Sequence, residues 1–127
     1  MMTESQLFFI KTIGIMPLMS RCKIAWYSNI YTQKVVDNID GVLNEDGSQF
    51  TFFLTEENKR ILKRASKEDH IELHIFYFEV NQDNIKLFVA YDAFEIGLIS
   101  PLVKLPDGYV KEFIIDAQVC SITNIDS

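Results

Sequence analysis

The two histidines of this sequence, His70 and His74, flank Glu72 at a spacing of two residues. Imidazole and carboxylate groups are common ligands of zinc. The neighbouring residues are β-branched and aromatic, which predicts a strand with all three side chains on one face. Each residue advances a strand by about 3.3 Å, so the two histidines would stand roughly 13 Å apart and could not share one metal. Either histidine with Glu72 would need a third ligand from elsewhere. The segment therefore predicts a polar sheet edge, and we expect no metal or cofactor.

A possible acid–base arrangement lies at the ends of the same segment. We expect a hairpin over residues 70–94, and its polar end would carry His74, Tyr91, Asp92 and Glu95. Imidazole and carboxylate side chains in a pocket could donate and accept protons. This predicts, as one alternative, a small-ligand pocket or a weakly marked active site. The simpler interpretation is a solvated strand end, because an acidic chain produces such groupings by chance.

Nucleophilic catalysis has no support in the sequence. There is no Gly-x-Ser-x-Gly motif, and the five glycines form no phosphate-binding loop. Cys22 and Cys120 have no histidine neighbour and no metal or redox spacing. We expect them to be free, buried thiols. The protein is accordingly predicted not to be an enzyme.

Charge is distributed unevenly along the chain. The net charge is −6, and five of the twelve basic residues lie between Lys59 and Lys67. The other residues hold seven basic and eighteen acidic side chains, a net charge of −11. Such a surface repels nucleic acid and anionic membranes and attracts basic proteins. The basic run itself fits an exposed helix face, which could contact an acidic groove or another copy of the chain.

These features predict a non-enzymatic binding protein with a basic protein as its partner. An inhibitor or immunity-type protein that neutralises a basic toxin or nuclease would combine small size with an acidic surface, an analogy by charge and size alone. The ten Phe, five Tyr and one Trp either fill the core or leave an apolar patch, and a homodimer through such a patch is an alternative. The expected partner contacts are six carboxylates and two aromatic anchors: Asp37, Asp40, Glu45, Asp46, Asp92, Glu95, Trp26 and Tyr109.

The apolar run from Leu7 to Met16 must be distinguished from a targeting segment. Glu4 stands where a signal peptide has basic residues, and Lys11 interrupts the run. The run is also too short to span a bilayer. We therefore predict a buried strand over residues 7–15 and a cytoplasmic protein.

The predicted hairpin is the centre of the expected fold. Its two strands, 70–80 and 85–94, flank an Asn/Asp-rich turn at 81–84. The expected register pairs Glu79 with Lys86 and His74 with Tyr91. Near the turn both faces are apolar, so we expect this end to be covered on both sides.

The remaining elements complete a single predicted domain, residues 1–127. Thr55 should cap a helix, and Asp107 a shorter one. A turn at Asp46-Gly47 should pair Leu43 with Phe50. Further strands are expected over 22–27, 49–54 and 117–123, while 31–39 is ambiguous between helix and strand. With 48% hydrophobic residues, the prediction is an α+β fold: a mostly antiparallel, twisted sheet of five or six strands with one or two helices on one face.

Overall fold

A seven-stranded mixed sheet forms the frame of the protein, with the strand order β2-β3-β1-β4-β5-β6-β7. The computed structural model describes residues 2–27 and 33–125. Its strands are β1 (Arg21–Trp26), β2 (Gly41–Leu43), β3 (Gln49–Phe53), β4 (Ile75–Gln82), β5 (Ile85–Tyr91), β6 (Ile96–Ile99) and β7 (Cys120–Ile122). Neighbouring strands are antiparallel except β6 and β7, which are parallel. The α+β class and the central place of the hairpin are confirmed. The sheet has more strands than expected and one parallel pair, and the described residues form four α-helices where one or two were expected.

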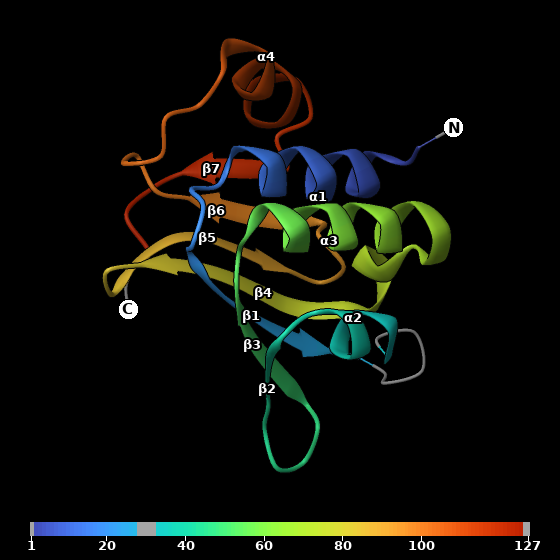
Figure 1. Cartoon of the computed structure of the whole chain (residues 1–127). Helices are drawn as coiled ribbons and strands as arrows, with labels where there is room; N and C mark the ends of the chain where they lie inside the picture. The colour runs from blue at the N-terminus through green and yellow to red at the C-terminus, as the bar shows by residue number, and fades with distance from the viewer. Residues whose placement is uncertain (1, 28–32, 126–127) are drawn as a thin grey trace.

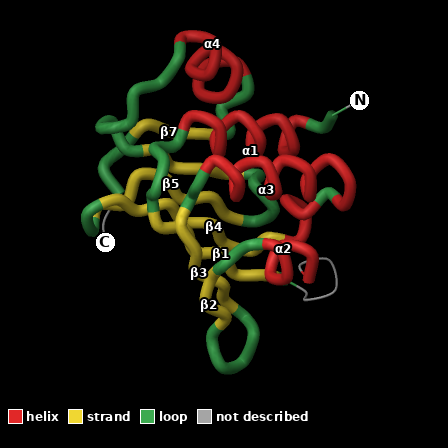
Figure 2. Tube along the Cα trace, viewed as in Figure 1, coloured by secondary structure: helices red, strands yellow, loops and turns green. Residues whose placement is uncertain are grey.

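The helices lie on one side of this sheet (Figures 1 and 2). They are α1 (Glu4–Ile15), α2 (Gln33–Asn38), α3 (Glu56–Asp69) and α4 (Asp107–Tyr109), with a 3-10 segment η1 (Ile71–His74) and a π-helical segment η2 (Val110–Asp116). Helices α1 and α3 run side by side across the sheet, while α4 lies near β7 and α2 near the β2 side. Among the described residues, no helix is both long and apolar enough to cross a membrane.

The core between helices and sheet is largely aromatic. Eight of the ten phenylalanines are buried, so most of the aromatic surplus fills the interior. The Phe8 ring of α1 meets Phe88 and Phe94 edge-on, at centroid distances of 5.8 and 5.9 Å. Such pairs contribute about 0.5–1.5 kcal/mol beyond their buried area. Gly97 of β6 permits this close approach, because a Cβ there would lie 2.7 Å from Cζ of Phe8.

The segment predicted as a first strand, residues 7–15, is instead helix α1. Its N-terminus carries a capping-box sequence in which Oγ1 of Thr3 accepts a hydrogen bond from the Gln6 amide (3.1 Å). The helix lies between the sheet, α3 and the α4–η2 segment, so it is apolar on most sides. An apolar run of this kind gives no periodicity that separates a buried helix from a buried strand.

The hairpin exists, but its register differs from the prediction. Asp83 and Asn84 form the turn with φ of 52° and 66°, and a bulge between Val80 and Asn81 precedes it. Tyr77, rather than His74, therefore pairs with Tyr91. The first strand also begins five residues later than expected, at Ile75. Before it, the chain completes α3, turns at a left-handed residue and forms η1.

Several local predictions are confirmed. Oγ1 of Thr55 accepts the Asn58 amide proton and caps α3 (3.0 Å), and Leu43 pairs with Phe50. The described part of the ambiguous segment 31–39 is the helix α2, with Tyr31 and Thr32 outside the described residues. The prediction that Asp107 caps the shorter helix is wrong, because Pro106 is the N-cap of α4, Asp107 is its first residue and no side chain caps it.

The two cysteines are buried free thiols on well-separated strands. Cys22 lies on β1 and Cys120 on β7, with three strands between them. Burial raises the pKa of both thiols, to about 11 for Cys120. At neutral pH both are therefore protonated and weak nucleophiles.

Candidate partner-binding surface

The sheet has one face that the described helices do not cover, which we call the open face. Side chains alternate between the two faces along each strand. Phe78 and Phe88 point toward α1, whereas Tyr77, Glu79 and Tyr91 belong to the open face. Near the turn the prediction of a hairpin covered on both sides is therefore wrong. Tyr77 and Tyr91 are suited to this face, because a tyrosine hydroxyl can face water.

Four aromatic side chains gather on the open face at the end where β1 stops. The ring of Tyr27 meets that of Phe76 at 5.6 Å, and the ring of Tyr77 meets that of Tyr91 at 5.4 Å. Tyr27 is 57% exposed and Phe76 49%. A bulge between Ala25 and Trp26 leaves Phe76 outside the β1–β4 pairing. We call these four residues the aromatic end; large exposed aromatics grouped in this way are typical of protein contacts.

Carboxylates border the aromatic end on the β5–β6 side. The Tyr27 hydroxyl donates to Oδ1 of Asp92 (3.0 Å), and this bond, with the nearby charges of Asp92 and Glu95, raises the pKa of Tyr27. Asp92 begins a turn of three left-handed residues that ends at Phe94. Phe94 enters the core, while Asp92 and Glu95 remain exposed. The turn thus anchors these two carboxylates beside the aromatic rings.

The β2–β3 loop brings further carboxylates to the same end of the sheet. The Trp26 amide donates to the carbonyl of Ser48 (3.4 Å), which holds the loop next to the end of β1. Within the loop, Asp46 accepts from the Ser48 hydroxyl (2.6 Å) and amide (2.9 Å), and these bonds lower the pKa of Asp46. Glu45 is exposed beside it. Four of the predicted contact residues, Glu45, Asp46, Asp92 and Glu95, therefore lie at one end of the strands.

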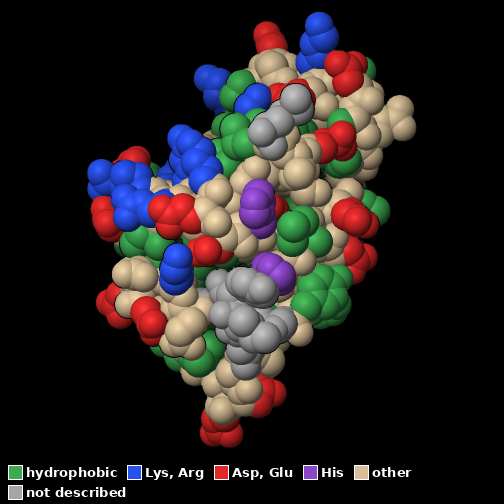
Figure 3. Space-filling model, turned by 90° about the vertical axis from the view of Figure 1, so that its right-hand side faces the viewer, with side chains coloured by type: hydrophobic (Ala, Val, Ile, Leu, Met, Phe, Trp, Pro, Cys, Tyr) green, Lys and Arg blue, Asp and Glu red, His purple; other side chains and the backbone are tan. Residues whose placement is uncertain are grey.

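The other two predicted carboxylates, Asp37 and Asp40, are exposed on α2 and just after it. Figure 3 looks onto this end of the molecule. Acidic side chains occur at its foot and along its right-hand side, where hydrophobic side chains are also exposed. Basic side chains gather mainly at the upper left, on the side of the helices.

Part of the basic run on α3 has structural roles. Nζ of Lys59 donates to the carbonyls of Gly14 (3.1 Å) and Met16 (2.7 Å), and Arg60 pairs with Glu57 (2.5 Å). These contacts lie on the helix layer, away from the open face. Because these basic side chains lie on the helix layer, the charged side chains described beside the aromatic end are carboxylates.

The two aromatic anchors expected from the sequence do not reach the surface. Trp26 is 9% exposed and Tyr109 only 4%. The Tyr109 hydroxyl shares a hydrogen bond with Thr12 (2.8 Å), and its ring lies 5.0 Å from that of Phe113. Both side chains complete the core between helices and sheet. From the sequence, Tyr91 was named only for the alternative pocket, and Tyr27 and Phe76 were not identified as exposed aromatics. The bulge that places Phe76 outside the β1–β4 pairing has no clear sequence signal.

The residues of the alternative pocket also come to this end of the sheet. The Tyr27 amide donates to the carbonyl of His74 (2.9 Å), and the Ala93 amide donates to that of Ile75 (2.8 Å). The backbones carrying His74 and Asp92 are thus neighbours, although η1 replaces the expected strand at His74. Within residues 2–27 and 33–125, no group of three or more His, Cys, Asp or Glu could hold a metal ion.

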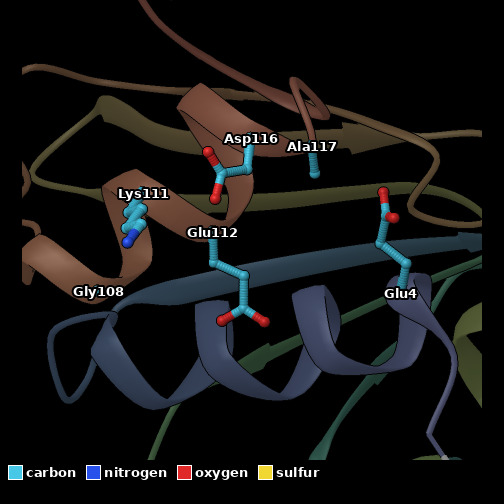
Figure 4. Close-up of a pocket in the computed structure, with 6 residues that line it drawn as sticks. All are labelled: Glu4, Gly108, Lys111, Glu112, Asp116 and Ala117. Atoms are coloured by element: carbon cyan, nitrogen blue, oxygen red, sulfur yellow. The ribbon is translucent and has the colours of Figure 1, made fainter.

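A separate acidic hollow lies on the helix layer, between α1 and the α4–η2 segment. Figure 4 shows Glu4, Glu112 and Asp116 around this space of about 410 Å³. Glu112 is paired with Lys11 at 2.6 Å. The hollow is shallow and part of its negative charge is already balanced, so the aromatic end is the better candidate for a partner.

Comparison with models of known protein families, with curated proteins and with solved structures found no match to this chain.

Proposed function

We propose that the protein is a non-enzymatic binding protein that holds a basic partner protein on the aromatic end of its open face. An inhibitor of the immunity type, which neutralises a basic toxin or nuclease, is the function that fits this arrangement. The observation that carries the proposal is a group of four aromatic rings, three of them exposed and that of Tyr77 half-buried, bordered by carboxylates from two loops.

The aromatic rings can supply most of the binding energy. Tyrosine is enriched among the residues that dominate protein interfaces, because its ring buries a large area and loses little conformational entropy. Tyr27 is held in place by its bond to Asp92 and its contact with Phe76. Preorganised side chains of this kind lose less entropy when a partner binds.

The carboxylates can supply orientation and selectivity. Glu45 and Asp46 lie on the β2–β3 loop, and Asp92 and Glu95 on the β5–β6 turn, so a partner over the aromatic end would meet negative charge on two sides. Complementary charge accelerates association with a basic protein and disfavours acidic ones. A toxin or nuclease that binds nucleic acid carries such a basic surface.

Affinity capture with the immobilised protein from lysate of the source organism, at low and high salt, tests the proposal. We expect a basic protein to be retained at low salt and released at high salt. Tyr91→Ser should reduce retention at least about tenfold, because it removes an exposed ring that would be buried against the partner. Leu102→Ser, at a side chain that is 69% exposed elsewhere, is the matched control and should retain the partner fully.

Charge is tested separately with a matched pair of double variants. Asp92→Asn with Glu95→Gln should weaken capture, whereas Glu57→Gln with Asp107→Asn removes two carboxylates from the helix layer and should leave it unchanged. Retention of no partner, or equal loss in both double variants, contradicts the proposal. Retention of only the protein itself would indicate a homodimer instead.

A further inference from the structure

The open face has a second region with a different chemistry, at the opposite end of the strands. A hollow of about 850 Å³ lies there. Its floor is formed by β3, β1 and β4, and its wall by the β4–β5 turn and by Met19 before β1. Ligand pockets commonly have volumes of about 300–1,000 Å³.

The strand register arranges the floor of this hollow as two rows of three side chains. Arg21 lies between Phe53 and Asn81 in one row. Lys23 lies between Thr51 and Glu79 in the other. Neighbouring strands are about 4.8 Å apart and alternate residues about 6.6 Å, so the six side chains span the dimensions of a small organic molecule.

The two central side chains are cations whose charge is available. Within the described part of the chain, Arg21 forms no ion pair. The positive charge of Lys23 helps to lower the pKa of Glu79, but the two side chains form no ion pair. Glu79 is 7% exposed and already engaged: it accepts from the Tyr77 hydroxyl (2.6 Å) and from the Asn81 amide, and lies 3.4 Å from Lys86. Its negative charge is therefore largely balanced without Arg21.

Polar and apolar side chains of β3 and β4 lie on either side of these two cations. Thr51 and Asn81 provide hydrogen-bonding side chains on either side of the central strand. Phe53, which is 52% exposed, offers a ring beside Arg21. A guanidinium binds planar carboxylate or phosphate groups through two parallel hydrogen bonds. An aromatic group attached to that anion would stack on Phe53.

We propose that this hollow binds a small aromatic anion, with its phosphate or carboxylate on Arg21 and Lys23 and its ring against Phe53. The site lies at the other end of the strands from the aromatic end and is independent of the partner proposed there. It also differs from the pocket expected at His74 and Tyr91.

A titration of the isotope-labelled protein with phenyl phosphate, followed by amide NMR shifts, tests the proposal. We expect saturable shifts centred on Arg21, Lys23, Thr51 and Asn81, with a dissociation constant below about 10 mM. A parallel titration with phenylacetate distinguishes a phosphate site from a carboxylate site. Neutral benzyl alcohol should bind at least about tenfold more weakly than the preferred anion, because it lacks the charge.

Matched variants separate this site from non-specific attraction. Arg21→Gln should weaken binding of phenyl phosphate about tenfold, whereas Lys63→Gln makes the same charge change on α3 and should have no effect. Phe53→Ser should weaken the binding of phenyl phosphate, because the ring loses its stacking partner. It should leave the weak binding of inorganic phosphate, which has no ring, unchanged. The amide spectrum of each variant shows directly whether it is folded. Absence of saturable shifts, or equal affinity in Arg21→Gln, would overturn the proposal.

Discussion

At the scale of single residues, Glu72 is the least expected side chain in the structure. It is a carboxylate with no exposed surface, although charged groups are rarely buried without a partner. Its Oε1 accepts the Ser66 hydroxyl at 2.6 Å. Its Oε2 lies 3.7 Å from Nδ1 of His70 and, among the described residues, accepts no hydrogen bond. The carboxylate therefore depends on a single close donor.

This dependence predicts a strong coupling between the two side chains. Ser66→Ala should lower the free energy of unfolding by about 2 kcal/mol, because it leaves a buried carboxylate without its donor. In a Glu72→Leu background the same substitution should cost less than about 0.5 kcal/mol, since no charge remains. Urea unfolding of the four proteins in a double-mutant cycle measures the difference. Additive effects would show that the bond does not stabilise the fold.

The segment around Glu72 also shows what residue types alone can predict. The sequence correctly marked His70, Glu72 and His74 as a polar group, but a strand was the wrong geometry. His70 ends α3 with φ of 51°, a conformation that has no clear sequence signal when the residue is not glycine or asparagine. The 3-10 turn that follows then buries Glu72 rather than exposing it.

At the scale of elements, α1 and α3 are joined by a contact that the sequence does not reveal. Helix α1 has no basic residue in its last turn, where a cation would favour the exposed carbonyls. Lys59 of α3 takes this role by donating to Gly14 and Met16. A residue from a distant part of the chain thus caps the helix that was predicted as a strand.

Lys59→Met should accordingly lower the free energy of unfolding by about 1 kcal/mol, because the carbonyls at the end of α1 lose a charged donor. Lys63→Met is the matched control, one turn later on the same helix, and should change stability by less than about 0.5 kcal/mol. Chemical denaturation of both variants provides the comparison. If both variants lowered stability equally, the effect of Lys59 would come from the loss of a positive charge on α3 and not from its hydrogen bonds to Gly14 and Met16.

The elements differ in how well their sequences specify them. Helix α3 has a strong cap and an acidic first turn, and the prediction that Thr55 caps it is confirmed, although the helix continues to Asp69. The hairpin was recognised from its composition, but its register depends on a left-handed pair at Asp83 and Asn84 and on a bulge. A shift of one residue exchanges the two faces of a strand, so the predicted register could not show that Tyr77 and Tyr91 lie opposite each other.

At the scale of the whole molecule, the basic run of α3 and the carboxylates of the aromatic end lie on different sides of the sheet. The basic run lies on α3 in the helix layer, whereas the described carboxylates at the aromatic end lie beside the uncovered side of the sheet. The net charge of −6 therefore understates the field that a partner would meet at that end. Sequence composition predicted the acidic surface, but only the fold places the aromatic rings among these charges.

This arrangement predicts that charge and aromatic contacts act on different steps of partner binding. With the captured partner purified, Asp92→Asn with Glu95→Gln should lower the association rate about tenfold at low salt and change dissociation little. Tyr91→Ser should instead accelerate dissociation, because it removes buried contact area. Surface plasmon resonance at several salt concentrations measures both rates, and the difference in association should shrink above about 0.5 M salt as the charges are screened. If the double carboxylate variant dissociated faster at every salt concentration while associating normally, these carboxylates would be buried in the interface rather than steering the partner toward the aromatic rings.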